Sequence, residues 1–153
     1  MHCCIFCRQA VVGQAVKTKG SKISVLSDQE GFPVELRLEA AQRHDLYACT
    51  GLIEKIPAQT IIVADRGYDA QWFRQKCRKR GLKPLIPKRE MGKNKKKKTN
   101  DPITRMGRWR CERLFAWMAK FRKLQTRYER HSKHYEAFWY LGFSVLLLGH
   151  FNG

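Results

Sequence analysis

The sequence predicts an α/β fold in which helices pack on a mixed sheet. Three observations carry this prediction: polar and apolar residues alternate in two runs within residues 22–38, residues 61–64 form a continuous branched apolar run, and apolar residues at helical spacing recur after it. In chain order the expected elements are hairpin, helix, buried strand, helix, strand, loop, helix and helix. That order is typical of a mixed sheet with helices packed on it.

The first half of the chain predicts a hairpin, a helix and a buried strand. Residues 22–27 and 32–38 alternate as half-buried strands do, and residues 28–31, ending in Gly31, supply a turn between them. Residues 43–56 are expected to be helical. Residues 61–64 predict a strand buried on both faces, which ends at Asp65.

The second half predicts a helix, an edge strand, a loop and two further helices. Residues 68–80 have helical spacing and stop at Gly81. Residues 82–87 contain two prolines, which suit only an edge strand. Residues 88–104 predict a basic loop, and a helix running through residue 124 and a last helix over 133–149 follow it. The first of these helices has its apolar stripe at Leu114, Trp117, Met118, Phe121 and Leu124.

Charge is concentrated in one segment. The 153 residues contain 31 Lys and Arg against 13 Asp and Glu, a net charge of +18. Residues 1–73 are neutral, with eight of each sign, whereas residues 74–133 hold the other 23 basic residues against four acidic ones, a net +19. Such an excess predicts a polyanionic partner, and it favours nucleic acid over an anionic membrane surface. With 43% hydrophobic residues, the chain can still bury a core.

Cysteines and apolar runs exclude several other classes. Only Cys4 and Cys7 have the spacing of zinc ligands, and no second pair completes a site, so we interpret the six cysteines as scattered free thiols. No secretory signal is evident, so the chain is expected to remain inside the cell. The longest apolar run, residues 137–151, is too short and interrupted to span a membrane.

Two carboxylates stand out by position. Asp65 ends a buried strand, where α/β sheets expose functional groups. Glu112 lies on a basic helix face beside Arg105, Arg108 and Lys123. Each has a simpler structural interpretation. Asp65 would be a turn residue that hydrogen-bonds its own backbone, and Glu112 would pair with Arg108 on the surface for at most about 0.5 kcal/mol. Together they form a pattern that suits acids binding divalent metal beside a phosphate backbone.

Several ordered motifs around these residues resemble the DDE transposases of bacterial insertion sequences (group four/five). The resemblance covers roughly residues 17–150 and includes the upstream hairpin. The motifs that carry it are Ala64-Asp65-Arg66-Gly67-Tyr68-Asp69, Pro84-Leu85-Ile86-Pro87, Arg108-Trp109-Arg110-Cys111-Glu112-Arg113-Leu114-Phe115-Ala116-Trp117, and Phe121-Arg122-Lys123-Leu124-Gln125-Thr126-Arg127-Tyr128.

The resemblance implies a ribonuclease-H-like fold and an Asp-Asp-Glu set that holds two divalent ions, Mg²⁺ or Mn²⁺, in the complete enzyme. Asp65 matches the second aspartate and Glu112 the glutamate, so both are candidate catalytic and metal-binding residues. The implied partner is DNA, both the ends of the element and its target. The resemblance also implies a homo-oligomer that acts in the bacterial cytoplasm, without a membrane partner. The candidate DNA contacts are Arg105, Arg108, Lys120, Arg122, Lys123 and the run Lys95, Lys96, Lys97 and Lys98.

The start of the chain departs from the family pattern. The family's first aspartate lies on a strand before the hairpin, and residues 1–27 contain no Asp or Glu. We therefore expect a fold without its first strand, as in a truncated or frame-shifted copy: a non-matching segment 1–16, then a partial catalytic domain 17–153 with the basic loop 88–104. Such a transposase chain should cleave DNA little or not at all. The alternative is a non-catalytic nucleic-acid-binding protein or an inhibitor of an intact transposase.

Two further features allow a functional and a structural interpretation. The four tryptophans, Trp72, Trp109, Trp117 and Trp139, suit base stacking, although aromatic residues at helical spacing are more often core residues. Trp109 is the exception, because it lies off the apolar stripe. His44 and Asp45 resemble a catalytic pair, but adjacent helical residues point apart, which favours a structural role.

Overall fold

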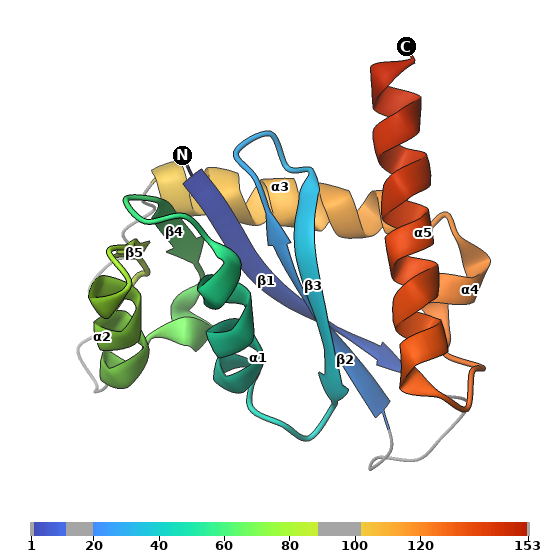
Figure 1. The fold of residues 1–153 in the computed structure, drawn as a ribbon, viewed down its shortest axis with the longest axis horizontal. Helices are drawn as coiled ribbons and strands as arrows, with labels where there is room; N and C mark the ends of the chain where they lie inside the picture. The colour runs from blue at the N-terminus through green and yellow to red at the C-terminus, as the bar shows by residue number, and fades with distance from the viewer. Residues whose placement is uncertain (1, 12–19, 89–101, 153) are drawn as a thin grey trace.

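The computed structural model describes the backbone of residues 2–11, 20–88 and 102–152, and the side chains of residues 20–88 and 108–152. Its centre is one five-stranded sheet with the strand order β3-β2-β1-β4-β5 (Figure 1). The strands are β1 His2–Val11, β2 Gly20–Ser27, β3 Pro33–Ala40, β4 Ile61–Ala64 and β5 Lys83–Leu85. β2 is antiparallel to both β1 and β3, whereas β4 runs parallel to both β1 and β5. The predicted mixed sheet is therefore confirmed, as is β5 at its edge.

The expectation that the first strand is missing is wrong. Residues His2–Val11 form β1 at the middle of the sheet, where Val11 lies opposite Gly20 of β2 and Ile5 opposite Ala64 of β4. Residues 1–27 contain no Asp or Glu, but the absence of an acidic residue does not remove the strand. A strand needs only backbone hydrogen-bond partners on each side, and β1 has them whether or not it carries an acid.

The β2–β3 hairpin forms where the alternating pattern predicted it. Its turn is held by Asp28, whose carboxylate oxygen Oδ1 accepts hydrogen bonds from the amides of Glu30 and Phe32, both at 2.9 Å. Gly31 has φ +91°, a conformation that favours glycine. Asp28 therefore has the structural role of a turn residue.

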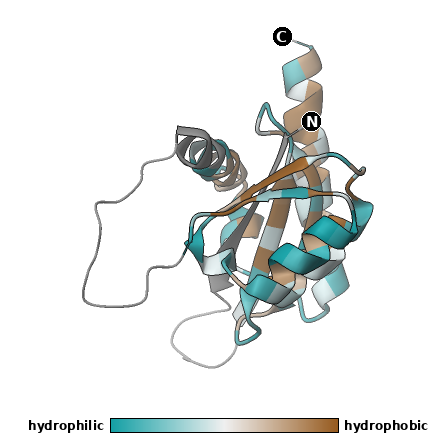
Figure 2. Cartoon of the chain, turned by 90° about the vertical axis from the view of Figure 1, so that its left-hand side faces the viewer, coloured by the Kyte–Doolittle hydropathy of each residue, from teal (hydrophilic) through white to brown (hydrophobic). Residues whose placement is uncertain are grey.

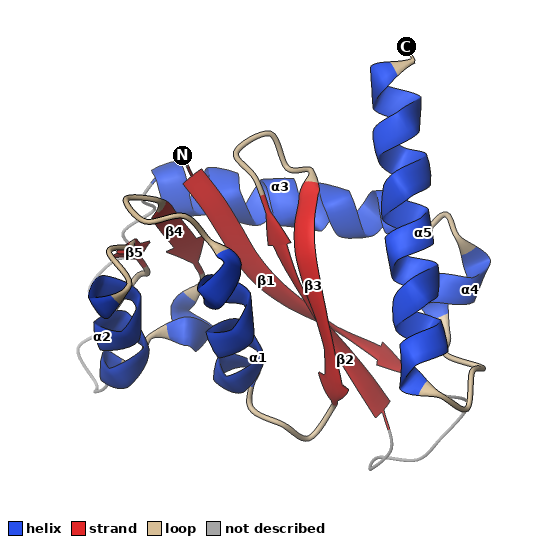
Figure 3. Ribbon diagram, in the orientation of Figure 1, coloured by secondary structure: helices blue, strands red, loops and turns tan. Residues whose placement is uncertain are grey.

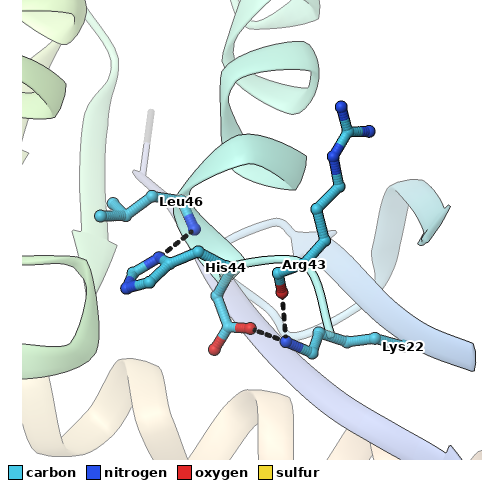
Figure 4. Close-up of polar contacts among 5 residues, drawn as sticks. Lys22, Arg43, His44 and Leu46 are labelled. Carbon is cyan, nitrogen blue, oxygen red and sulfur yellow. Dashed lines mark hydrogen bonds and ion pairs between the residues drawn. The ribbon is translucent and has the colours of Figure 1, made fainter. Parts of the chain in front are cut away.

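One face of the sheet is covered by α1 Asp45–Leu52, the short 3₁₀ turns Ile53–Lys55 and Arg66–Tyr68, and α2 Gln71–Lys79. His44 caps α1 by accepting a hydrogen bond from the Leu46 amide at Nδ1, while Lys22 binds the Asp45 carboxylate and the Arg43 carbonyl (Figure 4). His44 and Asp45 thus serve separate contacts at the start of α1. The core on this face contains, from the sheet, Leu26, Ile62 and Ala64.

The other face is covered by α3 Pro102–Met118, the short α4 Arg122–Gln125 and α5 Ser132–Phe151 (Figure 3). Its core takes Ile23, Val25, Leu36 and Val63 from the sheet. Since Ile62 and Val63 enter different cores, β4 is buried on both faces, as predicted. In Figure 2 hydrophobic colour is prominent on the strands and on much of α5, whereas α2 is largely hydrophilic.

The helix predicted to run through Leu124 is interrupted. α3 ends at Met118, and Leu124 belongs to α4, where its carbonyl accepts a hydrogen bond from the Tyr135 hydroxyl at 2.7 Å. Both Met118 and Leu124 still reach one core, packed over Gly142 of α5. The apolar spacing survives the break because α5 supplies a single packing surface for both segments. Within the described residues, no helix is long and apolar enough to cross a membrane.

Candidate nucleic-acid interface and acidic pair

Asp65 lies directly after β4 and starts the 3₁₀ turn Arg66–Tyr68. Its Oδ1 accepts a hydrogen bond from the Gly67 amide at 2.8 Å, and the residue is half-buried. A Cβ on Gly67 would lie 3.0 Å from that oxygen, so the glycine permits the close approach. The turn interpretation of Asp65 is therefore correct, and the turn fixes its carboxylate at the end of a central strand.

The loop that carries Asp65 is anchored by a contact that the sequence reasoning missed. Arg74 of α2 donates a hydrogen bond from Nε to Asp69 Oδ1 at 2.8 Å, and its Nη2 lies 2.7 Å from the same oxygen. Nη2 also donates to the Ile86 carbonyl at 2.6 Å. Both charged side chains are mostly buried, with 17% and 16% exposed. The only sequence signal was Asp69 as the last residue of the Asp65 motif. Arg74 thus joins the Asp65 loop, α2 and the end of β5.

Glu112 and Arg108 form an ion pair on the outer face of α3. The distance from Arg108 Nε to Glu112 Oε1 is 2.8 Å, and the side chains are 67% and 60% exposed. The hydrogen bond and the charge of Glu112 raise the pKa of the Arg108 guanidinium, and the negative charge of Asp65 raises it further. The fold therefore brings the carboxylate of Asp65, at the end of β4, within electrostatic range of the Arg108–Glu112 pair on α3.

These carboxylates do not fit a centre for two divalent ions. Among the side chains described, no group of three or more His, Cys, Asp or Glu residues is placed to hold a metal. The sequence of β1, which lies beside β4, contains no Asp or Glu. One oxygen of Asp65 binds a backbone amide, and one oxygen of Glu112 binds Arg108. In this arrangement the Arg108 guanidinium balances the charge of the Glu112 carboxylate.

The other predicted DNA contacts are spread more widely. Lys120, Arg122 and Lys123 lie after the end of α3, away from β4, and Lys123 Nζ lies 5.0 Å from the centre of the Phe138 ring (Figure 1). The break in the helix removes Lys123 from the face of Glu112. Lys95, Lys96, Lys97 and Lys98 lie outside the described residues, as does the side chain of Arg105.

The tryptophans divide between core and surface. Trp139 is buried, whereas Trp109 is 55% and Trp72 44% exposed. On α3, the Arg113 guanidinium lies over two indole rings, 4.6 Å from the ring centre of Trp109 and 4.7 Å from that of Trp117. Arg113 also donates to the Glu30 carbonyl in the β2–β3 turn. This stack fixes α3 against the hairpin.

The mixed sheet between two helical layers, with Asp65 at a strand end and the Arg108–Glu112 pair on the outer face of α3, defines the class as an α/β protein. The family model described as the transposase DDE domain matches residues 10–148. The chain therefore belongs to the DDE transposases of insertion sequences, which confirms the resemblance of the motifs.

Individual relatives agree with this assignment. A putative transposase for insertion sequence element IS402 from Burkholderia cepacia is 34% identical over 136 residues, which cover 80% of this chain and 60% of the relative. The chain thus spans less than two thirds of that protein. Two solved structures are weakly similar, each at 12% identity over 78% of this chain. They are the catalytic core domain of BIV integrase (TM-score 0.36, 72% of that chain) and a simian T-cell lymphotropic virus intasome in complex with PP2A regulatory subunit B56 gamma (TM-score 0.41, 42% of that chain).

Proposed function

We propose that this chain acts in DNA transposition as the DNA-binding part of a ribonuclease-H-like transposase domain, and that by itself it cleaves DNA little or not at all. Its proposed ligands are the ends of an insertion sequence and the target DNA, in the bacterial cytoplasm. The observation that carries the proposal is the exposed Arg108–Glu112 ion pair on α3, with Asp65, more than forty residues earlier in the chain, within electrostatic range of Arg108. Membership of the transposase DDE domain family supports it.

The charge distribution supports DNA as the partner. The net charge of +18 lies almost wholly in residues 74–133, which include the exposed Arg108, Lys120, Arg122 and Lys123. Guanidinium groups bind phosphate oxygens in a bidentate geometry, and ammonium groups bind them as point charges. We assign these residues, with Arg105 and the lysine run 95–98, to phosphate contacts. Such contacts position a protein on DNA without reading its bases.

The acidic residues support the expectation that the chain cleaves DNA little or not at all. We assign Asp65 and Glu112 to the second and third positions of the family's acidic set, as candidate catalytic and metal-binding residues. Divalent ions held by a complete acidic set would supply activation of the attacking oxygen and stabilisation of the leaving oxygen. The sequence of β1 supplies no carboxylate to complete the set. We therefore expect Mg²⁺ or Mn²⁺ to bind weakly and strand cleavage to be absent or very slow.

A salt titration tests DNA binding by the chain. The logarithm of the affinity for duplex DNA should fall linearly with the logarithm of salt concentration, with a slope of about −0.9 for each phosphate contacted. Arg108→Ala should reduce the slope by about one contact. Arg78→Ala, an equal change of charge on an exposed residue of α2, is the control and should leave it nearly unchanged. A flat salt dependence of the unaltered chain would refute the proposal.

A nicking assay tests the catalytic part. Supercoiled plasmid is incubated with the chain and Mg²⁺ or Mn²⁺, alongside Asp65→Ala and Glu112→Ala. We expect no nicking above background from any of the three proteins. Nicking by the unaltered chain that both substitutions abolish would show that it is an active enzyme.

A second candidate is a binding protein without cleavage chemistry, including an inhibitor of an intact transposase. The lack of any acidic residue in β1 favours it, because a binding module needs no acidic set. Replacement of both Asp65 and Glu112 by alanine would then leave DNA affinity intact or tighter. Addition of the chain to an intact transposase of the same element would lower transposition only if the chain competes for its DNA or its subunits.

A further inference from the structure

Trp109 is the most exposed indole described in the structure, and its placement is unusual for a tryptophan. Trp139 is buried at 5% exposure, whereas Trp109 is 55% exposed. The fully buried Met118 follows Trp109 by nine positions. At about 100° per residue, this spacing places the two side chains on opposite sides of α3. Trp109 therefore lies on the outermost ridge of the helix and contributes little to the core.

The Trp109 ring is nevertheless held in one place. The Arg113 guanidinium lies 4.6 Å from its centre, and the same guanidinium stacks over Trp117 and donates to the Glu30 carbonyl. Trp117 in turn stacks against Phe32, with 6.2 Å between ring centres. An exposed indole that is fixed by a cation on a rigid support loses little conformational freedom when a flat ligand stacks on it.

Trp109 is also beside the candidate phosphate contacts. It follows Arg108 directly, and three residues separate it from Glu112, which is about 60° away around the helix. A DNA strand with its phosphate at Arg108 would pass along the Trp109 ridge. Because the nearest bases of a duplex are stacked inside it, only an unpaired base could reach the ring.

From these observations we propose that Trp109 is a stacking platform for an unpaired DNA base next to the phosphate bound by Arg108. This inference rests on the proposed DNA-binding function and deepens it, because it makes the preferred ligand a strand with unpaired bases. Aromatic stacking tolerates any base, so the platform would add affinity without sequence selectivity.

Binding of a short fluorescein-labelled single-stranded oligonucleotide, and of the matching duplex, tests the proposal. Trp109→Ala should weaken single-strand binding by about tenfold, as expected for the loss of one base–aromatic stack, and change duplex binding less than about twofold. Trp109→Phe should retain most of the affinity, because it keeps an aromatic face. Trp72→Ala, which removes another exposed tryptophan from α2, is the matched control and should have no effect on either ligand.

Fluorescence and folding measurements complete the test. Oligonucleotide binding should quench the tryptophan emission of the unaltered chain more than that of Trp109→Phe. Circular dichroism should show that all variants keep their helical content. If the unaltered chain binds DNA but Trp109→Ala binds single strands equally well, or loses single-strand and duplex affinity alike, the stacking proposal is wrong and the DNA-binding function stands. If the unaltered chain binds neither ligand, the proposed function itself fails.

Discussion

Glu112 occupies the guanidinium of Arg108, one helical turn away, with 2.8 Å between Oε1 and Nε. Both side chains are more than half exposed, so a phosphate can reach Arg108 only in competition with this carboxylate. Asp65 adds its negative charge from the end of β4. The carboxylates of Asp65 and Glu112 thus restrain the arginine that we assign to DNA.

Glu112→Ala is therefore expected to tighten DNA binding severalfold. The substitution frees Arg108 for a phosphate and removes a negative charge from the same face. The salt slope should change by less than about one phosphate contact, because Arg108 already contributes a contact in the unaltered chain. The control is Glu54→Ala, which removes an exposed carboxylate paired with Lys76. Equal effects of the two substitutions would show that only net charge matters.

Arg74→Ala is expected to destabilise the fold by about 2 kcal/mol or more. Arg74 makes charge-assisted hydrogen bonds to Asp69 and the Ile86 carbonyl, and its loss leaves the mostly buried Asp69 without this partner. Urea unfolding monitored by circular dichroism measures the change. Arg78→Ala in the same helix is exposed and should change stability by less than about 0.5 kcal/mol. A similar loss for both variants would contradict the anchoring role of Arg74.

Gly31→Ala should cost about 1–2 kcal/mol, because a residue with a Cβ is strained at φ +91°. The new Cβ would also lie 2.9 Å from Nη2 of Arg113 and 3.2 Å from Cβ of Arg110. Gly149→Ala offers the opposite case, since nothing lies within 4 Å of its Cβ position in α5. That variant should gain up to about 1 kcal/mol from helix propensity. Thermal unfolding of the two variants should shift in opposite directions.

Glu35 should make stability depend on acidic pH. Burial by itself would raise the pKa of this carboxyl, but hydrogen bonds from Lys55, Tyr140 and the Leu36 amide outweigh it and leave the pKa below the ordinary 4.5. A lowered folded-state pKa gives stability that is present above pH 4.5 and is lost as the pH falls through the folded pKa. Tyr140→Phe removes a 2.6 Å hydrogen bond to Glu35 and should weaken this dependence.

Unfolding free energies measured from neutral pH down to about pH 3 test that expectation, because carboxyl groups titrate within this range. The difference in unfolding free energy between the unaltered chain and Glu35→Gln should be largest near neutrality and shrink toward acid. A difference that stays constant with pH would mean that the carboxylate is not the group that titrates.

The sequence by itself determined the elements whose signal is local. Alternation predicted the β2–β3 hairpin, the branched run predicted β4 with Asp65 at its end, and prolines predicted an edge strand. These patterns follow from the period of two in a strand and from side chains buried on both faces, so they need no distant partner. The family followed from ordered motifs on those elements.

The tertiary structure alone decided the features that depend on distant partners. β1 is central because β2 and β4 pair with its backbone, although its sequence lacks the expected acid. α3 ends at Met118, yet Met118 and Leu124 share one core because α5 packs against both segments. Asp65 comes within electrostatic range of Arg108 only once α3 lies against the sheet. Local periodicity fixes which face of a helix is apolar, whereas long-range packing fixes what that helix is brought to face.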